Sequence, residues 1–295
     1  MNNVTGWCGG LLNQFNHLIN GITLAHFNKR NICNPSFLVN YNKLDSILFS
    51  EVIDMDHFNK LLTSLNFNTT IEFDEDFEKQ EWVKKSYYNN LVLVDGIEHI
   101  SSILAQDDES YIDLGLLFAM YTIYDPDLSH RRLSIYKDMR FTQQYYDILN
   151  FCKTLLGEFC NVVHLRLEDD WIKACIVSHG GTFEEISDRL IASYNQKMDD
   201  VFNPNDTIYI ATHLLKSENK NNWIMEEIKK KYPNAVFTIP WRDKFPNVTK
   251  GREIDALVDY MICRNAQKFI GLAASTFSLA INTLLIMDNK VSIIF

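Results

Sequence analysis

Residues 207–239 decide the fold, and they read TIYIATHLLKSENKNNWIMEEIKKKYPNAVFTI. The apolar run 207–212 predicts a buried strand, 222–232 predicts a helix, and 235–239 predicts a second strand that ends at Pro240. Short apolar strands that alternate with helices of this length indicate a parallel sheet covered by helices on both faces. This stretch therefore predicts an α/β fold.

The same alternation continues through the rest of the C-terminal half. Further strands are predicted at 161–167, 268–272 and 291–295, and further helices at 184–198, 253–266 and 275–287. In such sheets ligands bind at the loops that follow the carboxyl ends of the strands. We therefore look for the site at the ends of these strands.

The N-terminal half is less regular. It opens with the segment 8–14, CGGLLNQ, continues as a helix to about Phe27 and returns as a strand near 31–39, which is a β-turn-α-β unit. A strand at 91–94 and a buried helix at 111–124 are also predicted. We therefore expect two Rossmann-like domains, 1–155 and 156–295, that face one another across a cleft, with the boundary near 151–159.

Charge and composition exclude several classes of protein. The net charge is −10, and no run of Lys and Arg is interleaved with aromatic residues, so nucleic acid is not an expected partner. No stretch is long and apolar enough to span a membrane, and no secretory signal opens the chain, so we expect a soluble protein of unknown compartment. The six cysteines lack metal-ligand spacing, so no metal is expected.

The segment 164–171 is the most informative one, and it reads HLRLEDDW. The period of a strand puts His164, Arg166 and Glu168 on one face and the leucines on the other. A polar face on a strand that is covered on both sides needs a reason, because an unpaired buried charge is costly. Two interpretations are open: an internal ion pair between Arg166 and a neighbouring carboxylate, or a binding site.

Two other segments can bind phosphate. In 269–278, FIGLAASTFS, a strand passes through small residues to Ser275 and Thr276 at the start of a helix, where unpaired amides bind anions. The alternative is that these hydroxyls only cap the helix. Gly9 and Gly10 precede the first helix and permit a tight turn, although they match neither GxGxxG nor a Walker loop.

Together these segments resemble the GDP-fucose protein O-fucosyltransferases, specifically the type that modifies EGF-like repeats. Residues 164–175 are similar to the HLR…DW…AC segment of that family, and Asp259, 269–271 and 275–277 are similar to its D…FIG…S-S/T-F block. The opening from Asn13 to Arg30 is similar to its GNQ…NRT segment, and 209–212 resembles its VYVATD strand. The region from about 45 to 150 shows little resemblance.

The resemblance implies a metal-independent, inverting GT-B transferase that moves L-fucose from GDP-fucose to a hydroxyl of a protein or glycan. No cofactor is implied, because GDP-fucose is the donor substrate, and the family suggests the secretory pathway. Arg166 and His164 would hold the β-phosphate, Asp259 would bind guanine, and Asn13 would lie near the reacting centre. The residues implied at the donor are Gly9, Gly10, Gln14, His164, Asp170, Asp259, Ser275, Thr276 and Phe277.

The chain departs from the family pattern at three places. It has His213 where the family's strand ends in Asp, Glu168-Asp169 where the family has Gly-Ser, and Gly10 where Arg is frequent. Glu168, or Asp169 beside it, is therefore a candidate general base for the acceptor hydroxyl. Glu168 joins Arg166 and Asn13 as a candidate catalytic residue.

Three other functions stay open. A metal-dependent transferase would use an Asp-x-Asp pair, and such pairs start at Asp54, Asp74 and Asp125. A transferase of the same fold could use another donor, such as a rhamnosyl nucleotide. A nucleotide- or carbohydrate-binding module without catalysis is the third alternative, and donor turnover would exclude it.

Overall fold

The computed structural model describes residues 10–33, 35–40, 45–72, 85–87, 111–113, 126–158, 160–214, 219–237 and 239–295. The chain divides into two compact units. The first unit comprises Met1–Tyr146 and Thr249–Leu257, and the second comprises Asp147–Val248 and Val258–Phe295. The chain passes between them within α5 (Gln143–Leu156), between Val248 and Thr249, and within α10 (Arg252–Arg264).

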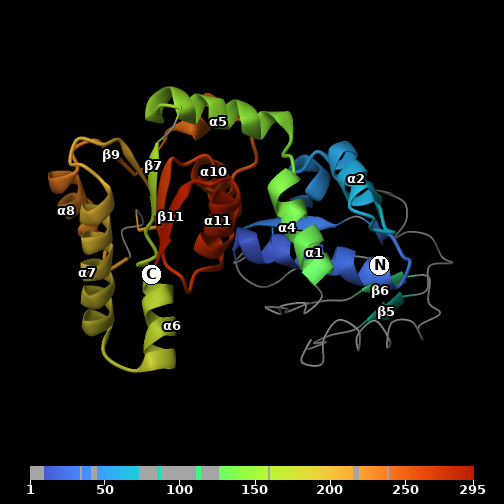
Figure 1. The fold of residues 1–295 in the computed structure, drawn as a ribbon, viewed down its shortest axis with the longest axis horizontal. Coiled ribbons are helices and arrows are strands. Elements are labelled where there is room, and N and C mark those ends of the chain that lie inside the picture. Colours follow the sequence, from blue (N-terminus) through green and yellow to red (C-terminus); the bar gives the residue numbers. More distant parts are fainter. Residues whose placement is uncertain are drawn as a thin grey trace. The chain divides into compact units, whose positions relative to one another are not determined.

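The second unit is built on a parallel sheet of five strands in the order β11-β10-β7-β8-β9. Its strands are β7 (Asn161–His164), β8 (Ile208–Ala211), β9 (Ala235–Val236), β10 (Lys268–Gly271) and β11 (Val291–Ile294). Figure 1 shows α7 and α8 on one side of this sheet and α10 and α11 on the other. The prediction of a parallel α/β fold is confirmed.

Helices follow the strands of this unit as the sequence pattern requires. They are α6 (Asp169–His179), α7 (Phe183–Val201), α8 (Ile224–Lys231), α9 (Trp241–Lys244), α10 and α11 (Thr276–Met287). Thr182 and Glu185 form a capping box at the start of α7, which explains why that helix begins where the apolar period begins.

The core of the second unit explains which way the β7 side chains point. Leu165 and Leu167 are fully buried in an apolar cluster with residues of α6, α7 and α8. His164 instead contacts Ser278 of α11, on the opposite face of the sheet. The predicted separation of His164 from the two leucines is therefore confirmed.

Helix α6 was not predicted, and β7 is shorter than predicted because it ends at His164 rather than Leu167. Asp169 and Asp170 occupy the first turn of α6, where carboxylates favour the positive end of the helix dipole. Gly180, with a φ of 73°, ends the helix. The acidic run is thus the start of a helix, not the polar edge of a strand.

In the residues that the structure describes, the first unit contains α1 (Leu11–Phe27), α2 (Met55–Ser64) and α4 (Pro126–Asp138) with three small strand pairs. Its strands are β1 (Ile32–Cys33), β2 (Ser36–Asn40), β3 (Asp45–Leu48), β4 (Ile71–Glu72), β5 (Lys85–Tyr87) and β6 (Tyr111–Asp113). Strands β1 and β4 pair in parallel, as do β5 and β6, and β2 and β3 pair antiparallel.

Two predictions for this unit need correction. The strand expected at 31–39 is divided into β1 and β2 on either side of Pro35, which has no N–H to donate. The helix expected at 111–124 is wrong at its start, because 111–113 pair with β5 as a strand. The rest of that helix and the strand expected at 91–94 lie outside the described residues.

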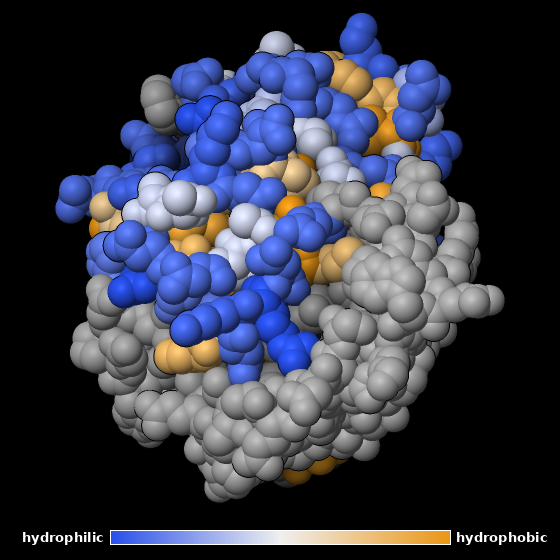
Figure 2. Space-filling view, turned by 90° about the vertical axis from the view of Figure 1, so that its right-hand side faces the viewer, coloured by the Kyte–Doolittle hydropathy of each residue, from blue (hydrophilic) through white to orange (hydrophobic). Residues whose placement is uncertain are grey.

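Among the described residues, none of the helices has the length and apolar character to cross a lipid bilayer. On the face drawn in Figure 2 these residues are mainly hydrophilic, and apolar residues are scattered among them. The five described cysteines are free thiols, four of which are buried.

Candidate functional site

The backbone at the end of β7 is held by a tyrosine from α7. The Tyr194 hydroxyl accepts the Arg166 N–H at 3.1 Å and donates to the His164 carbonyl at 2.9 Å. Burial raises the pKa of Tyr194 above its ordinary value, so the hydroxyl keeps its proton. The backbone from 164 to 166 therefore has a fixed position, although sequence reasoning assigned Tyr194 only to the apolar face of its helix.

The Arg166 guanidinium lies between two carboxylates and an aromatic ring. Its Nη1 donates to Glu168 Oε2 at 2.7 Å, its Nη2 lies 3.2 Å from Asp170 Oδ2, and its Cζ lies 5.6 Å from the centre of the Trp171 ring. Burial alone would lower the pKa of Arg166, but the carboxylates of Glu168 and Asp170 raise it. The ion pair that the sequence left open is present.

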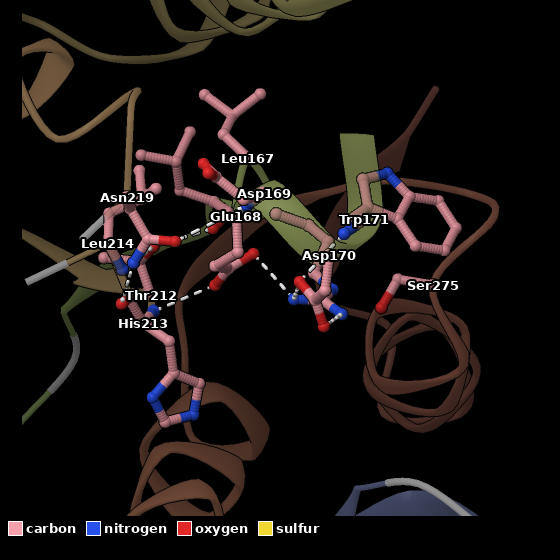
Figure 3. Close-up of polar contacts among 12 residues, drawn as sticks. Leu167, Glu168, Asp169, Asp170, Trp171, Thr212, His213, Leu214, Asn219 and Ser275 are labelled. Carbon is pink, nitrogen blue, oxygen red and sulfur yellow. Dashed lines mark hydrogen bonds and ion pairs between the residues drawn. The ribbon is translucent and has the colours of Figure 1, made fainter. Parts of the chain in front are cut away.

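The two carboxylates differ in exposure. The Asp170 side chain is 55% exposed, whereas the Glu168 side chain is 7% exposed. Figure 3 shows Glu168 between the loop that carries His213 and the guanidinium that it shares with Asp170. Glu168 Oε1 accepts the backbone N–H of His213 at 2.9 Å, so both oxygens of this carboxylate have partners.

Glu168 keeps its negative charge. Burial would raise its pKa, but the Arg166 guanidinium, and then the N–H groups of His213 and of Glu168 itself, hold it below its ordinary value. Residues 168 and 213 are two of the positions at which the sequence departs from the family pattern. The structure brings them into direct contact.

His164 connects β7 to the start of α11. Its ring lies 4.5 Å from the Phe277 ring, and its Nδ1 lies 2.8 Å from Ser278 Oγ. Burial lowers the pKa of His164 to about 4, so the imidazole is neutral near pH 7. Ser278 Oγ accepts the Leu272 N–H at 3.1 Å, and the Ser278 hydroxyl can donate its proton to His164 Nδ1. We therefore assign the ring proton of the neutral His164 to Nε2.

The first turn of α11 has the features of an anion site. Ser275 is the N-cap and its hydroxyl accepts the Ser278 N–H at 3.4 Å. In the part of the chain that the structure describes, the N–H groups of Thr276 and Phe277 have no hydrogen-bond partner. Figure 3 shows Ser275 on the side of Asp170 and Trp171.

The position of Gly271, the last residue of β10, has no room for a side chain. A Cβ there would lie 2.5 Å from Ser278 Oγ and 2.8 Å from Phe269 Cε1. Glycine is therefore required for the Ser278 hydroxyl to reach both Leu272 and His164. Ser278 was missed as a positioning residue, although its place three residues after the cap was a usable signal.

Asp259 lies on α10 and accepts a hydrogen bond from the hydroxyl of Tyr209 on β8. Burial, and then the neighbouring Asp259 carboxylate, raises the pKa of Tyr209 well above its ordinary value, so this hydroxyl remains a donor. The side chain of Asp259 is therefore anchored to the sheet of the second unit rather than being an ordinary solvent-facing helix carboxylate.

The N-terminal candidates belong to the first unit. Gly9 lies outside the described residues. Gly10 is the N-cap of α1, and Asn13 is half-buried in its first turn. The Gln14 amide is buried, and it both donates to the Leu38 carbonyl at 3.0 Å and accepts the Leu38 N–H at 2.7 Å. Gln14 thus joins α1 to β2.

The start of α1 also has an acidic partner that was not foreseen. Glu253, which is 1% exposed, accepts the Leu11 N–H through Oε2 at 2.7 Å. A carboxylate already complements the positive end of this helix. The first turn of α1 therefore already has an anionic partner within the chain.

Among the described residues, no group of three or more His, Cys, Asp or Glu side chains could hold a metal ion. Asp54, the first residue of one predicted Asp-x-Asp pair, is the N-cap of α2 and accepts the His57 N–H. Asp74 and Asp125, which begin the other two pairs, lie outside the described residues.

The second unit is thus a parallel α/β domain with a cation and a helix start after the carboxyl ends of its strands, where ligands bind in such sheets. The sequence profile of the family described as GDP-fucose protein O-fucosyltransferase matches residues 5–284. The chain belongs to this family, and it is a fucosyltransferase by that membership.

Solved structures agree with this fold. POFUT1 in its apo form matches with a TM-score of 0.60 and 14% identity, over 100% of this chain and 97% of that chain. POFUT1 in complex with GDP-fucose matches with a TM-score of 0.58 and 13% identity over the same shares. Fucosyltransferase NodZ from Bradyrhizobium matches with a TM-score of 0.52 and 10% identity, over 92% and 88%. No curated protein sequence matches the chain significantly.

Proposed function

We propose that this chain is an inverting, metal-independent transferase that moves L-fucose from GDP-β-L-fucose to a hydroxyl of a protein or glycan. The observation that carries the proposal is the link made by His164. Its ring contacts the first turn of α11, and Arg166 follows it by two residues in the segment after β7. A guanidinium and a helix start that both follow strands of one parallel sheet suit a diphosphate.

The proposed roles follow from these contacts. The Arg166 guanidinium binds the β-phosphate and stabilises the charge that develops as the bond to fucose breaks. The N–H groups of Thr276 and Phe277, with the hydroxyl groups of Ser275 and Thr276, bind the diphosphate oxygens. The neutral ring of His164 donates from Nε2 to the same group, because Nδ1 is turned to Ser278.

Asp170 has a different part in donor binding. Its carboxylate is exposed, and exposed ion pairs contribute only about 0–1 kcal/mol, so a diphosphate can displace it from Arg166. We propose that the donor takes the place of Asp170 beside the guanidinium. The free energy lost when the Asp170–Arg166 pair separates is then smaller than the free energy gained from the phosphate contacts.

The remaining roles concern the rest of the donor and the acceptor. We propose a GT-B arrangement in which the 156–295 domain binds the nucleotide and the 1–155 domain binds the acceptor. In this proposal Asn13, half-buried in α1, acts near the reacting centre, and Gly9 and Gly10 before it in the sequence contribute to donor binding. Gln14 supports this turn through Leu38.

In the transfer, the acceptor hydroxyl attacks the anomeric carbon from the face opposite GDP. The carbon–oxygen bond to the β-phosphate breaks, its electron pair leaves with GDP, and the hydroxyl proton is released. The product has the inverted configuration. Arg166 and the α11 amides supply the positive charge that a metal ion supplies in metal-dependent transferases.

Calorimetric titration with GDP, UDP and dTDP tests the donor. GDP is expected to bind most tightly, and a preference for dTDP or UDP would instead favour a rhamnosyl or other donor. Release of GDP from GDP-fucose, with and without EDTA, tests the reaction. Activity that is lost in EDTA and restored by a metal would contradict metal independence. Binding of GDP without turnover of GDP-fucose would favour a binding module without catalysis.

A pair of variants tests the guanine contact. Asp259→Asn removes the charge proposed to bind guanine, whereas Tyr209→Phe keeps the carboxylate and removes only its structural partner. The preference for GDP over UDP is expected to fall in the first variant and to persist in the second. Equal effects in both would assign Asp259 a structural role.

A further inference from the structure

Glu168 is a buried carboxylate that binds two elements of the site at once. Oε2 accepts from Arg166 Nη1 at 2.7 Å, and Oε1 accepts the His213 N–H at 2.9 Å. Arg166 belongs to the segment that follows β7, and His213 to the loop that follows β8. One side chain therefore fixes a cation and a loop relative to each other at the carboxyl edge of the sheet.

The loop after β8 is fastened to the same segment by further contacts. Thr212 Oγ1 donates to the Leu165 carbonyl at 2.9 Å, and Asn221 Nδ2 donates to the Leu167 carbonyl at 3.0 Å. Asn219 Nδ2 donates to the His213 carbonyl at 3.0 Å. Glu168 is the member of this set that carries a charge and reaches Arg166.

The geometry argues against proton transfer by Glu168. A general base needs an oxygen that can approach the reacting hydroxyl, but both oxygens of this carboxylate are engaged and the side chain is 7% exposed. The neighbouring guanidinium also stabilises the charged form. These observations differ from the general-base role that the sequence suggested.

We propose that Glu168 is a positioning residue, which holds the Arg166 guanidinium and the His213 loop in the geometry that the diphosphate requires. The proposal rests on the proposed function, in which Arg166 binds the β-phosphate. Arginine is long and flexible, so its orientation must come from partners that stay in place. Asp170 is displaced by the donor, whereas buried Glu168 remains bound.

Glu168→Gln is the main test, because glutamine has nearly the same shape but only one acceptor oxygen. It cannot accept from both Arg166 and His213. We expect kcat for fucose transfer and for hydrolysis of GDP-fucose to fall by about ten- to a hundredfold, the range for loss of a hydrogen bond to a charged group. Glu227→Gln, which changes a surface pair on α8, is the matched control and is expected to keep its activity.

Measurement of GDP affinity separates positioning from simple electrostatics. Removing a negative charge beside a diphosphate site would tighten GDP binding and raise activity if Glu168 only contributed its field. Loss of orientation instead lowers kcat whatever the change in affinity. A Glu168→Gln enzyme that binds GDP more tightly and turns over as fast as wild type would overturn the proposal.

A double-mutant cycle with Arg166→Lys provides the second readout. If Glu168 acts through Arg166, Glu168→Gln lowers kcat in the wild type but adds little in the Arg166→Lys background. A general base would give additive losses and would remove the acidic limb of the pH–rate profile. Additive losses of kcat, together with loss of the acidic limb, would show that Glu168 acts as a general base and not as a positioning residue.

Folding is checked with a second variant and a stability measurement. Glu168→Asp keeps the charge with a shorter reach, and it is expected to recover part of the activity. A loss of kcat that follows only the fraction unfolded at the assay temperature would also overturn the proposal. If the wild type does not turn over GDP-fucose, the proposed function is overturned. If the wild type is active and Glu168→Gln is equally active, only the positioning role of Glu168 is overturned.

Discussion

His164 Nδ1 and Ser278 Oγ lie 2.8 Å apart and join the end of β7 to the first turn of α11. The same hydroxyl accepts the Leu272 N–H at the end of β10. One buried serine thus connects three elements whose ends form the proposed phosphate site. The serine is 0% exposed, so the groups that it pairs are paired inside the protein.

Ser278→Ala should lower both stability and donor affinity. The Leu272 N–H loses its acceptor and His164 loses its donor, and leaving buried polar groups unpaired costs about 1–3 kcal/mol. Urea denaturation and GDP titration would measure the two effects. Ser193→Ala removes an exposed hydroxyl that bonds only within α7, and it should change neither quantity. Unchanged GDP affinity in Ser278→Ala would separate this serine from the site.

Arg166→Lys should reduce kcat by about a hundredfold or more, because loss of a preorganised donor to a developing charge has this effect in other enzymes. Arg166→Ala is less informative, since it leaves buried Glu168 without its cation and should also destabilise the fold. Steady-state kinetics with thermal unfolding would distinguish the two. Arg242→Lys, which alters another arginine beside a tryptophan ring, is the control. Near-normal turnover in Arg166→Lys would contradict the role assigned to Arg166.

Stability should depend on pH through His164. Burial lowers its pKa in the folded chain from 6.5 to about 4, so between these values the unfolded chain binds a proton that the folded chain does not. The free energy of unfolding should therefore fall by on the order of 2 kcal/mol as pH decreases from about 6.5 to 4.

Denaturation of wild type and His164→Gln across this range would isolate the histidine from the carboxylates. His179→Gln, at the exposed end of α6, provides the comparison. The free energy of unfolding should change less with pH in His164→Gln than in the wild type and in His179→Gln. Parallel curves for all three would show that His164 does not titrate in this window.

Tyr194→Phe should destabilise the protein by about 1–3 kcal/mol and lower donor affinity, because the His164 carbonyl and the Arg166 N–H both lose their partner. Tyr232→Phe is the matched control, since its hydroxyl bonds to Asp199 at the surface. GDP titration of the two variants should show a change only in the first. An equal loss of GDP affinity in both variants would point to a general effect of stability.

Much of the second unit could be predicted from the sequence because its signals are local. Buried parallel strands are short apolar runs, and helices such as α7 and α11 begin at recognisable caps, Thr182 and Ser275. The alternation that separates Leu165 from Arg166 is equally local. These features need no knowledge of distant contacts.

The errors arise where distant parts of the chain decide the structure. Residues 111–113 form a strand because they pair with 85–87, and an apolar period cannot reveal that partner. Glu168 gained its role from His213, which is 45 residues away. Glu253 caps α1 from a separation of 242 residues. Such long-range polar contacts leave no spacing in the sequence from which to infer them.

The acidic surroundings of Arg166 affect how quickly an anionic donor arrives. Glu168 and Asp170 place two carboxylates beside one guanidinium, in a chain of net charge −10. Long-range attraction accelerates association only when the field at the site has the sign opposite to the ligand. If the donor binds at Arg166 as proposed, this charge should slow the association of a nucleotide sugar, and added salt, by screening the repulsion, should quicken it.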